Sequence, residues 1–217
     1  MRHETDLLIF DWDGTLFDSI DWIVTCLQQA ASQTGLREPS LREARSVIGL
    51  SLQAALDTLY PGEDDANAQR LVAEYRKIYH TRPLSSLGLY RGVPELLASL
   101  RQAGYQLAVA TGKARSGLDA ALDETGTRHL FDTTRCADET ASKPDPLMVE
   151  QILDELQVAK TRAIMIGDSL HDLRMAHRAG IRAIGVSQGA NDHEELMTLS
   201  PVFCIAEIHE LSRHLLA

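Results

Sequence analysis

The sequence predicts an α/β protein, a doubly wound parallel sheet with a Rossmann-like core, that carries a small all-α cap domain. From residue 88 to the C-terminus, short apolar runs alternate with amphipathic helical patterns, an order typical of a parallel sheet with helices on both faces. One further apolar run, residues 7–10, opens the chain, and only helical patterns lie between the two parts. The helical segment is therefore expected to be an insertion after the first strand.

Length and composition place the chain among ordinary globular proteins. A chain of 217 residues can fill one α/β domain, or a core domain with a smaller insertion. Its apolar fraction of 44% and charged fraction of 24% give no sign of disorder. The formal net charge of -10 argues against a nucleic acid or an anionic membrane as partner, because either needs a basic surface.

Cysteine usage and the first residues bear on where the protein is found. The three cysteines are far apart in the sequence and odd in number, which favours buried small side chains over a disulfide framework or a zinc site. The chain enters its first strand through acidic residues and without a long apolar region, which argues against a signal peptide. No apolar run approaches the length of a membrane span. We therefore expect a cytoplasmic protein.

The first predicted strand ends in two carboxylates. Residues 7–10 are all apolar and run directly into Asp11 and Asp13, which are followed by a turn at Gly14 and Thr15. Open α/β sheets bind ligands at the carboxyl ends of their strands, so both acids are candidates for a site. Asp and Gly are also ordinary turn residues, and the stretch taken alone is equally consistent with a polar turn.

The helical segment covers residues from about 18 to about 82. Its expected helices begin after a polar capping residue and end at glycine or proline. They begin at Asp18 or Ser19, at Ser40, at Ser51 and at Asp64 or Asp65, and they end at Gly35, Gly49, Pro61 and Pro83. We expect residues 17–83 to form the cap and residues 1–16 and 84–217 to form the core. The cap would stand over the carboxyl edge of the sheet as a lid.

Five more strands are expected after the helical segment. They cover residues 105–110, 133–137, 162–166, 181–186 and 202–205. Two of them are followed by polar residues that are candidates for catalysis or ligand binding. The first is followed by Thr111 and Lys113, and the third by Asp168 and Asp172. With the two acids of the opening strand, three strand ends therefore carry candidate site residues.

These polar residues are expected to converge. The carboxyl ends of parallel strands lie on one edge of the sheet, which brings Asp11, Asp13 and Asp168 together without proximity in sequence. Clustered carboxylates repel each other and need a positive partner. An all-oxygen site of this kind suits Mg²⁺, and Lys143, in a loop before a helix, would supply a second positive group. Such a site suits phosphoryl transfer with a carboxylate as nucleophile.

Four segments of the sequence resemble, in order and spacing, the four motifs of the haloacid-dehalogenase-like superfamily of phosphatases. They are Asp11-Trp12-Asp13-Gly14-Thr15, Thr111, Lys143 and Gly167-Asp168-Ser169-Leu170-His171-Asp172. The helical insertion is similar to the small helical cap of the branch that includes phosphoglycolate phosphatases and β-phosphoglucomutases. The resemblance spans nearly the whole chain, and the four motifs together are more specific than any one of them.

The resemblance implies a role for each motif residue. Asp11 would be the nucleophile, and Asp13 the general acid that protonates the leaving oxygen and then the base towards water. Mg²⁺ would be held by the Asp11 carboxylate, the Asp13 carbonyl and Asp168. Asp172 would steady these ligands. The groups that would bind the phosphoryl oxygens are Thr111, the Gly112 N–H and Lys143.

Several residues near the motifs have two interpretations. Gly49 lies in a turn that resembles the one such relatives point at the active site, and its other interpretation is a plain helix break. Lys113 and Arg115 are expected either to reach substrate or to solvate the start of a helix. Ser169 fits equally an N-cap and a site residue. His171 fits a surface position or one that contacts the site residues from behind.

The expected function is a Mg²⁺-dependent phosphomonoester hydrolase that acts on a small phosphorylated metabolite through an aspartyl-phosphate intermediate. Phosphoglycolate is the first substrate expected, because the cap resembles that branch, and a hexose phosphate or pyrophosphate comes next. The alternatives are a sugar-phosphate mutase or a pyrophosphatase of the same fold. From another class, a non-catalytic sensor of a phosphorylated ligand is also considered. The sequence leaves the oligomeric state open.

Overall fold

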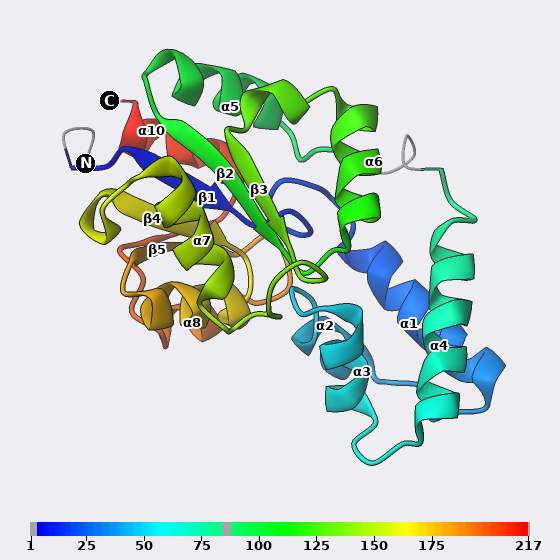
Figure 1. Cartoon of the computed structure of the whole chain (residues 1–217). Helices are drawn as coiled ribbons and strands as arrows, with labels where there is room; N and C mark the ends of the chain where they lie inside the picture. The colour runs from blue at the N-terminus through cyan, green and yellow to red at the C-terminus, as the bar shows by residue number, and fades with distance from the viewer. Residues whose placement is uncertain (1–3, 84–87, 217) are drawn as a thin grey trace.

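A parallel sheet forms the centre of the protein. The computed structural model describes residues 4–83 and 88–216. Within these ranges six strands pair in the order β3-β2-β1-β4-β5-β6, and every pairing is parallel (Figure 1). The strands are β1 Leu7–Phe10, β2 Gln106–Thr111, β3 Thr133–Cys136, β4 Ala163–Gly167, β5 Arg182–Val186 and β6 Cys204–Ile205. The predicted doubly wound fold is confirmed, and the strand order reverses beside β1.

Strand β1 is buried on both faces, which explains its unbroken apolar sequence. Leu8 and Phe10 belong to one hydrophobic cluster, and Leu7 and Ile9 belong to a second cluster on the opposite face. The first cluster includes side chains of α5 Val93–Gln102, α6 Arg115–Thr125 and α10 Leu211–Leu215, and the second those of α7 Leu147–Leu156, α8 Leu170–Ala179 and α9 His193–Met197. Helices therefore cover both faces of the sheet.

The strand register brings the polar strand ends to one edge. Phe10 of β1 lies opposite Val109 of β2 and opposite Ile166 of β4. Asp11 therefore leaves the sheet at the level where both neighbouring strands also end. This is the edge at which α/β sheets of this topology form a ligand crevice.

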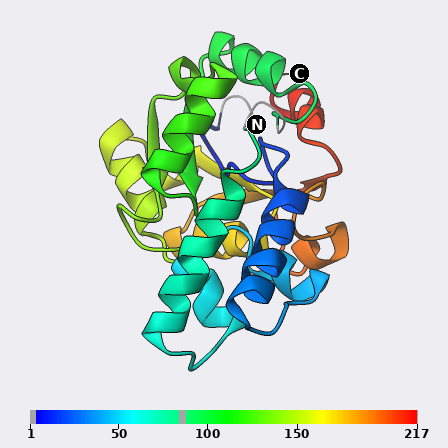
Figure 2. The ribbon, with the colours of Figure 1, turned by 90° about the vertical axis from the view of Figure 1, so that its right-hand side faces the viewer.

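The chain after β1 forms an all-α insert. Its helices are α1 Ile20–Thr34, α2 Leu41–Ser46, α3 Leu52–Leu59 and α4 Asp65–Tyr79. Helices α1 and α4 pack along each other, and the insert has its own hydrophobic cluster, apart from the two clusters of the sheet. Figure 2 shows these blue and cyan helices gathered at one end of the molecule. The insert has the place and composition predicted for a cap.

Three expected helix starts in the insert are confirmed by their capping bonds. The Ser40 hydroxyl accepts a hydrogen bond from Glu43 N, and the Glu43 carboxylate accepts one from Ser40 N, which completes a capping box. Ser51 and Asp64 cap α3 and α4 with their side-chain oxygens. Ser19 stands at the N-cap position of α1 but makes no side-chain capping bond, because its hydroxyl is used elsewhere.

Some local features differ from the predictions. Helix α2 ends at Ser46 rather than at Gly49, because residues 47–50 form a turn against loops of the core. Helix α9 was not predicted, because its five residues are too few to show the periodicity of a helix. The predicted return from cap to core at residue 84 and the core residues 1–3 and 217 lie outside the described residues. The division into residues 17–83 and the remainder therefore stays a prediction.

The cysteines behave as small side chains. All three are free, as the sequence predicts. Cys26 is buried in the hydrophobic cluster of the insert, and Cys136 is buried in a cluster of the core. None of the helices in the described ranges is both long and apolar enough to cross a membrane.

Candidate active site

A buried lysine joins two acids at the carboxyl edge of the sheet. Lys143 Nζ donates to Asp11 Oδ1 and to Asp172 Oδ1, each at 2.6 Å. All three side chains are at most 1% exposed. Burial raises the pKa of Asp11 well above its usual value, although Lys143 opposes the shift. Burial also disfavours the charged lysine, yet the two carboxylates raise the pKa of Lys143, so it remains a cation.

Three buried carboxylates gather around this lysine. Asp11, Asp168 and Asp172 each present an oxygen within 4.8 Å of the others. Burial, together with the charge of Asp172, raises the pKa of Asp168 to about 7. Asp11 Oδ2 is buried and has no hydrogen-bond partner among the described residues. One lysine does not balance three carboxylates, so the cluster has the donor set and the excess negative charge of a site for a hard cation.

Two loops fix the position of Asp168. Thr15 Oγ1 donates to Asp168 Oδ1 at 2.7 Å, and Ala190 N donates to Asp168 Oδ2 at 2.7 Å. A Cβ on Gly14 would lie 2.2 Å from Asp168 Oδ2, and one on Gly189 would lie 2.0 Å from it. Both glycines are therefore required for the close approach of their loops. The Gly14-Thr15 pair, which follows the first two acids, serves to hold the acid of another strand.

Asp13 has a different set of partners from Asp11. Its Oδ1 accepts a hydrogen bond from the Ser19 hydroxyl and lies 3.1 Å from Lys113 Nζ. Lys113 Nζ also donates to the Tyr79 hydroxyl at 3.0 Å and lies 5.0 Å from the centre of the Tyr79 ring. Burial disfavours the charge of Lys113, but Asp13 and Tyr79 raise its pKa. Since Tyr79 ends helix α4, this group connects the core to the insert.

Thr111 and Gly112 bring the end of β2 into contact with the insert. The Thr111 hydroxyl accepts a hydrogen bond from Lys113 N at 3.2 Å. A Cβ on Gly112 would lie 2.3 Å from the carbonyl oxygen of Leu50 and 2.5 Å from that of Gly49. A Cβ on Gly49 would in turn lie 2.9 Å from the Ser169 hydroxyl. The Gly49 turn thus does more than end a helix, because it lies directly against two loops of the candidate site.

Hydrogen bonds from the same part of the insert hold it against the core. Ser51 N donates to the Ser142 hydroxyl at 2.8 Å, next to Lys143. The Arg45 guanidinium donates to the carbonyl oxygen of Gly189 at 2.8 Å. His171 Nε2 lies 2.8 Å from the carbonyl oxygen of Ser46. Each bond reaches a loop or a helix start that carries or adjoins a candidate site residue, so the insert is closed over the site.

A cavity of about 740 Å³ lies between the insert and the carboxyl edge of the sheet. The core residues on its wall include Asp11, Asp13, Thr111, Gly112 and Lys113. The insert supplies the facing wall, mainly with aliphatic and tyrosine side chains. The cavity therefore places the predicted nucleophile and the predicted general acid in one enclosed space.

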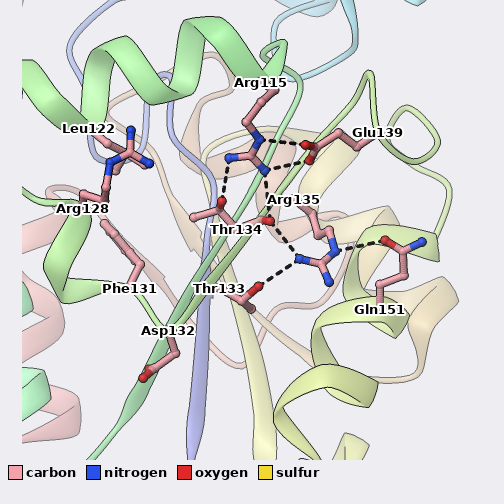
Figure 3. Close-up of a pocket in the computed structure, with 10 residues that line it drawn as sticks. All are labelled: Arg115, Leu122, Arg128, Phe131, Asp132, Thr133, Thr134, Arg135, Glu139 and Gln151. Carbon is pink, nitrogen blue, oxygen red and sulfur yellow. Dashed lines mark hydrogen bonds and ion pairs between the residues drawn. The ribbon is translucent and has the colours of Figure 1, made fainter.

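A second pocket, of about 550 Å³, lies beside strand β3 and contains none of the motif residues (Figure 3). The Arg115 guanidinium on its wall pairs with Glu139 at 2.7 Å and donates to the Thr134 hydroxyl at 2.8 Å. Arg135 donates to the hydroxyl of Thr133 at 2.9 Å. Arg115 lines this pocket and not the cavity of the motif residues, so the second of its two interpretations fits: it supports the start of α6 and the adjoining surface.

Ser169 caps helix α8 and touches the site. Its hydroxyl accepts from Asp172 N, and Ser169 N donates to Asp172 Oδ2 at 3.1 Å, which completes a capping box. The Ser169 hydroxyl also donates to Asp172 Oδ2 at 2.6 Å. The two interpretations of Ser169 are therefore compatible, because the capping bond orients an acid of the cluster. Asp172 is held by this box on one oxygen and by Lys143 on the other.

Comparison with known proteins adds the family. The family model described as haloacid dehalogenase-like hydrolase matches residues 8–186, a span that includes the insert and every motif residue. The chain belongs to this family. This hydrolase is a phosphatase of the family in its phosphoglycolate phosphatase-like branch, the one with a helical insert after the first motif.

Curated relatives cover nearly the whole hydrolase. A 5'-nucleotidase of Pseudomonas aeruginosa is 33% identical over 210 residues, which are 94% of this chain and 92% of the relative. A phosphoglycolate phosphatase of Vibrio cholerae is 29% identical over 216 residues, 94% of each chain. A pyrophosphatase, PpaX, of Bacillus velezensis is 27% identical over 205 residues, 94% of this chain and 93% of the relative.

Solved structures share the fold of the hydrolase. A hydrolase from Pseudomonas syringae superposes with a TM-score of 0.88 at 23% identity, over 98% of both chains. CbbY from Rhodobacter sphaeroides, solved in complex with phosphate, superposes with a TM-score of 0.79 at 22% identity, over 95% of this chain and 96% of CbbY. At this identity the likeness extends to the arrangement of sheet and insert.

The structure brings together most residues that the sequence singles out and adds others. Asp11, Asp168, Asp172 and Lys143 form one buried group. Thr111 and Gly112 line the cavity together with Asp11 of this group. Ser19 and Lys113, which contact Asp13, and Tyr79, which contacts Lys113, lie outside the four motifs. Thr15 belongs to the first motif, but its bond to Asp168 was not predicted. One signal was available for Lys113, which is one of only four lysines in the chain and directly follows a strand.

Proposed function

We propose that this hydrolase is a Mg²⁺-dependent phosphomonoesterase of a small phosphorylated metabolite and that Asp11 is its nucleophile. The observation that carries the proposal is the state of the Asp11 carboxylate. Asp11 lines the cavity, and Lys143 holds its Oδ1, while its Oδ2 has no hydrogen-bond partner in the described part of the chain. A carboxylate held through one oxygen and unengaged at the other is suited to nucleophilic attack.

Asp11 and Asp13, the two aspartates of the first motif, have different roles in the reaction. An oxygen of Asp11 forms a bond to phosphorus while the bond from phosphorus to the ester oxygen breaks, and Asp13 gives its proton to the leaving oxygen. Asp13 then takes a proton from the water that attacks the phosphorus of the Asp11 phosphoryl group, which frees Asp11 and releases inorganic phosphate. The separate contacts of Asp13 with Ser19 and Lys113 support its separate role.

The acid cluster fits Mg²⁺. The Asp11 carboxylate, the Asp13 carbonyl and Asp168 would hold the ion, and Asp172 would steady the cluster from its capping box. The all-oxygen donor set and the excess of negative charge support this assignment. When bound, the ion supplies positive charge that stabilises the phosphoryl oxygens.

The remaining motif residues bind the phosphoryl group. Thr111, the Gly112 N–H and Lys143 would donate to its oxygens, as preformed donors do in phosphoryl-transfer sites. Lys143 is already placed beside the Asp11 carboxylate, so it would balance charge in both the free and the phosphorylated enzyme. Gly49, in the turn that lies against Gly112, would bring the insert to the substrate.

The names of the relatives define the first substrates to assay. Phosphoglycolate comes first, because the insert is of that branch, and nucleoside 5'-monophosphates and pyrophosphate follow. Hexose phosphates are added from the expectation based on the sequence. A sugar-phosphate mutase of the same fold is the closest alternative. A non-catalytic sensor is disfavoured because the two acids of the first motif, the lysine and Asp168 are all present.

A Mg²⁺-supplemented screen of phosphate esters tests the proposal. Release of inorganic phosphate, lost in the Asp11→Asn variant, supports the phosphatase. An isomerised product that retains its phosphate identifies the mutase instead. If no ester in a broad panel yields phosphate or isomer, the sensor becomes the better account.

A further inference from the structure

The insert presents an apolar wall to the predicted nucleophile. Of the described residues on the cavity wall, seven from α1, α3 and the turn before α3 are aliphatic: Ile23, Leu27, Val47, Ile48, Leu50, Leu52 and Ala55. Tyr75 and Tyr79 of α4 stack on each other with ring centres 5.9 Å apart and complete this wall. A leaving group bound beneath the closed insert would therefore meet mainly carbon.

The charges on the cavity wall offer little to a second anion. Lys113 is the buried cation among the described wall residues, and its ammonium group is already paired with Asp13 and bonded to Tyr79. Arg76 and His80 also border the cavity, but both are exposed to solvent. Asp138, an exposed acid on the wall, would repel an anion.

A charged leaving group would lose its hydration in this space without gaining a buried ionic partner. Burial of an unpaired carboxylate is strongly unfavourable, whereas burial of apolar surface is favourable. The volume of about 740 Å³ lies within the range of cavities that enclose ligands much larger than a two-carbon acid. The size and the polarity of the cavity therefore both favour a leaving group that is uncharged and larger than glycolate.

We infer that the preferred substrate is the phosphate monoester of an uncharged alcohol with an apolar or aromatic body, which packs against the aliphatic wall and the Tyr75–Tyr79 stack. This inference rests on the proposed phosphatase function and narrows it. Phosphoglycolate and pyrophosphate, whose leaving groups are anions, are then slower substrates.

Esters with leaving alcohols of similar acidity test the inference, because intrinsic reactivity then does not decide the outcome. The panel is ethyl, butyl and benzyl phosphate, with phosphoglycolate as the anionic member, all with Mg²⁺. One methylene in an apolar pocket changes kcat/KM by about 10-fold or more. We expect kcat/KM to rise from ethyl to butyl to benzyl phosphate and to exceed that of phosphoglycolate by at least about ten-fold.

The possible outcomes separate this inference from the function on which it rests. Faster hydrolysis of phosphoglycolate, or equal hydrolysis of all four esters, overturns the apolar leaving group and leaves the phosphatase intact. Failure to release phosphate from any of the four and from the wider ester screen overturns both.

A variant with a new charge on the wall provides a second test. Leu52 is half-buried at the start of α3 and lines the cavity. We expect Leu52→Arg to raise the ratio of kcat/KM for phosphoglycolate to that for butyl phosphate by about ten-fold or more, since it adds the missing cation. Leu52→Gln is the matched control of similar length without charge. An equal shift in both variants, or no shift in either, contradicts the inference.

Discussion

Lys113 and Asp13 form a buried ion pair, with 3.1 Å between Nζ and Oδ1 and both side chains 10% exposed. A different lysine, Lys143, pairs with Asp11 at 2.6 Å. The two acids of the first motif are thus held by separate cations from separate loops. This separation allows one carboxylate to attack and the other to exchange protons, although they are only two residues apart.

Replacement of Lys113 should impair the proton-transfer role of Asp13. We expect Lys113→Met to lower kcat by about 10- to 100-fold, less than the 10²- to 10⁴-fold that general acid–base catalysis contributes in full, because Asp13 keeps its bond from Ser19. Steady-state kinetics on the best ester measures the change. Tyr79→Phe is the control, since it removes only the hydroxyl that Lys113 contacts and should have a smaller effect on kcat. Equal losses in both variants would show that the link to the insert, and not Asp13, is what Lys113 serves.

Replacement of Lys143 should cost stability as well as activity. Lys143→Met leaves two buried carboxylates without their cation, and removal of one partner from a buried pair costs about 3–5 kcal/mol. Urea denaturation in the presence of a chelator measures the free energy of unfolding. Lys77→Met is the control, because Lys77 is a surface lysine with a 73% exposed side chain, and it should change that free energy by less than about 0.5 kcal/mol. A Lys143→Met protein as stable as the wild type would mean that the acids are not held as described.

The contact between Gly112 and the Gly49 turn should be needed for closure of the insert. In Gly112→Ala the new methyl group would meet the Leu50 carbonyl at 2.3 Å, so the turn must move away. We expect kcat/KM to fall by about ten-fold or more, because a displacement of about 1 Å at a site costs up to about 100-fold. Hydrogen exchange of residues 46–51 should become faster in the same variant. Gly88→Ala, where a Cβ meets nothing within 4 Å, should change neither quantity.

Removal of the metal should abolish activity and lower thermal stability. A chelator is expected to stop phosphate release and Mg²⁺ to restore it. Because an ion that binds only the folded state stabilises it, Mg²⁺ should also raise Tm in the absence of substrate. Asp168→Asn should lose this rise in Tm, whereas Asp154→Asn, at an exposed position, should keep it. A Mg²⁺ effect on Tm that survives in Asp168→Asn would place the ion elsewhere.

The sequence predicts those parts of the site that follow from sheet geometry. Asp11 and Asp168 come together because parallel strands end on one edge, and an apolar run before each acid marks a strand. Helix starts at Ser40 and Ser51 are local and therefore also predictable from capping chemistry. These features depend on a few neighbouring residues or on a general rule of topology.

Other contacts depend on how the insert sits on the core, which no local pattern encodes. Tyr79 reaches Lys113 only because α4 ends beside the β2 loop, although 34 residues separate the two in sequence. Ser19 was predicted as an N-cap and does occupy that position, but its hydroxyl donates to Asp13 instead of capping the helix. The local sequence does not predict this bond. Gly189 approaches Asp168 through the loop after β5, whose conformation has no periodicity.

Detection of a phosphoryl group on Asp11 tests the account most directly. The enzyme is mixed with Mg²⁺ and its best ester, quenched in acid during turnover and treated with borohydride, which reduces an aspartyl phosphate to homoserine. Mass spectrometry then locates the change in the chain. The account predicts homoserine at position 11 in the wild type and none in Asp11→Asn. Unmodified Asp11 in the wild type, together with full phosphate release by Asp11→Asn, would contradict it.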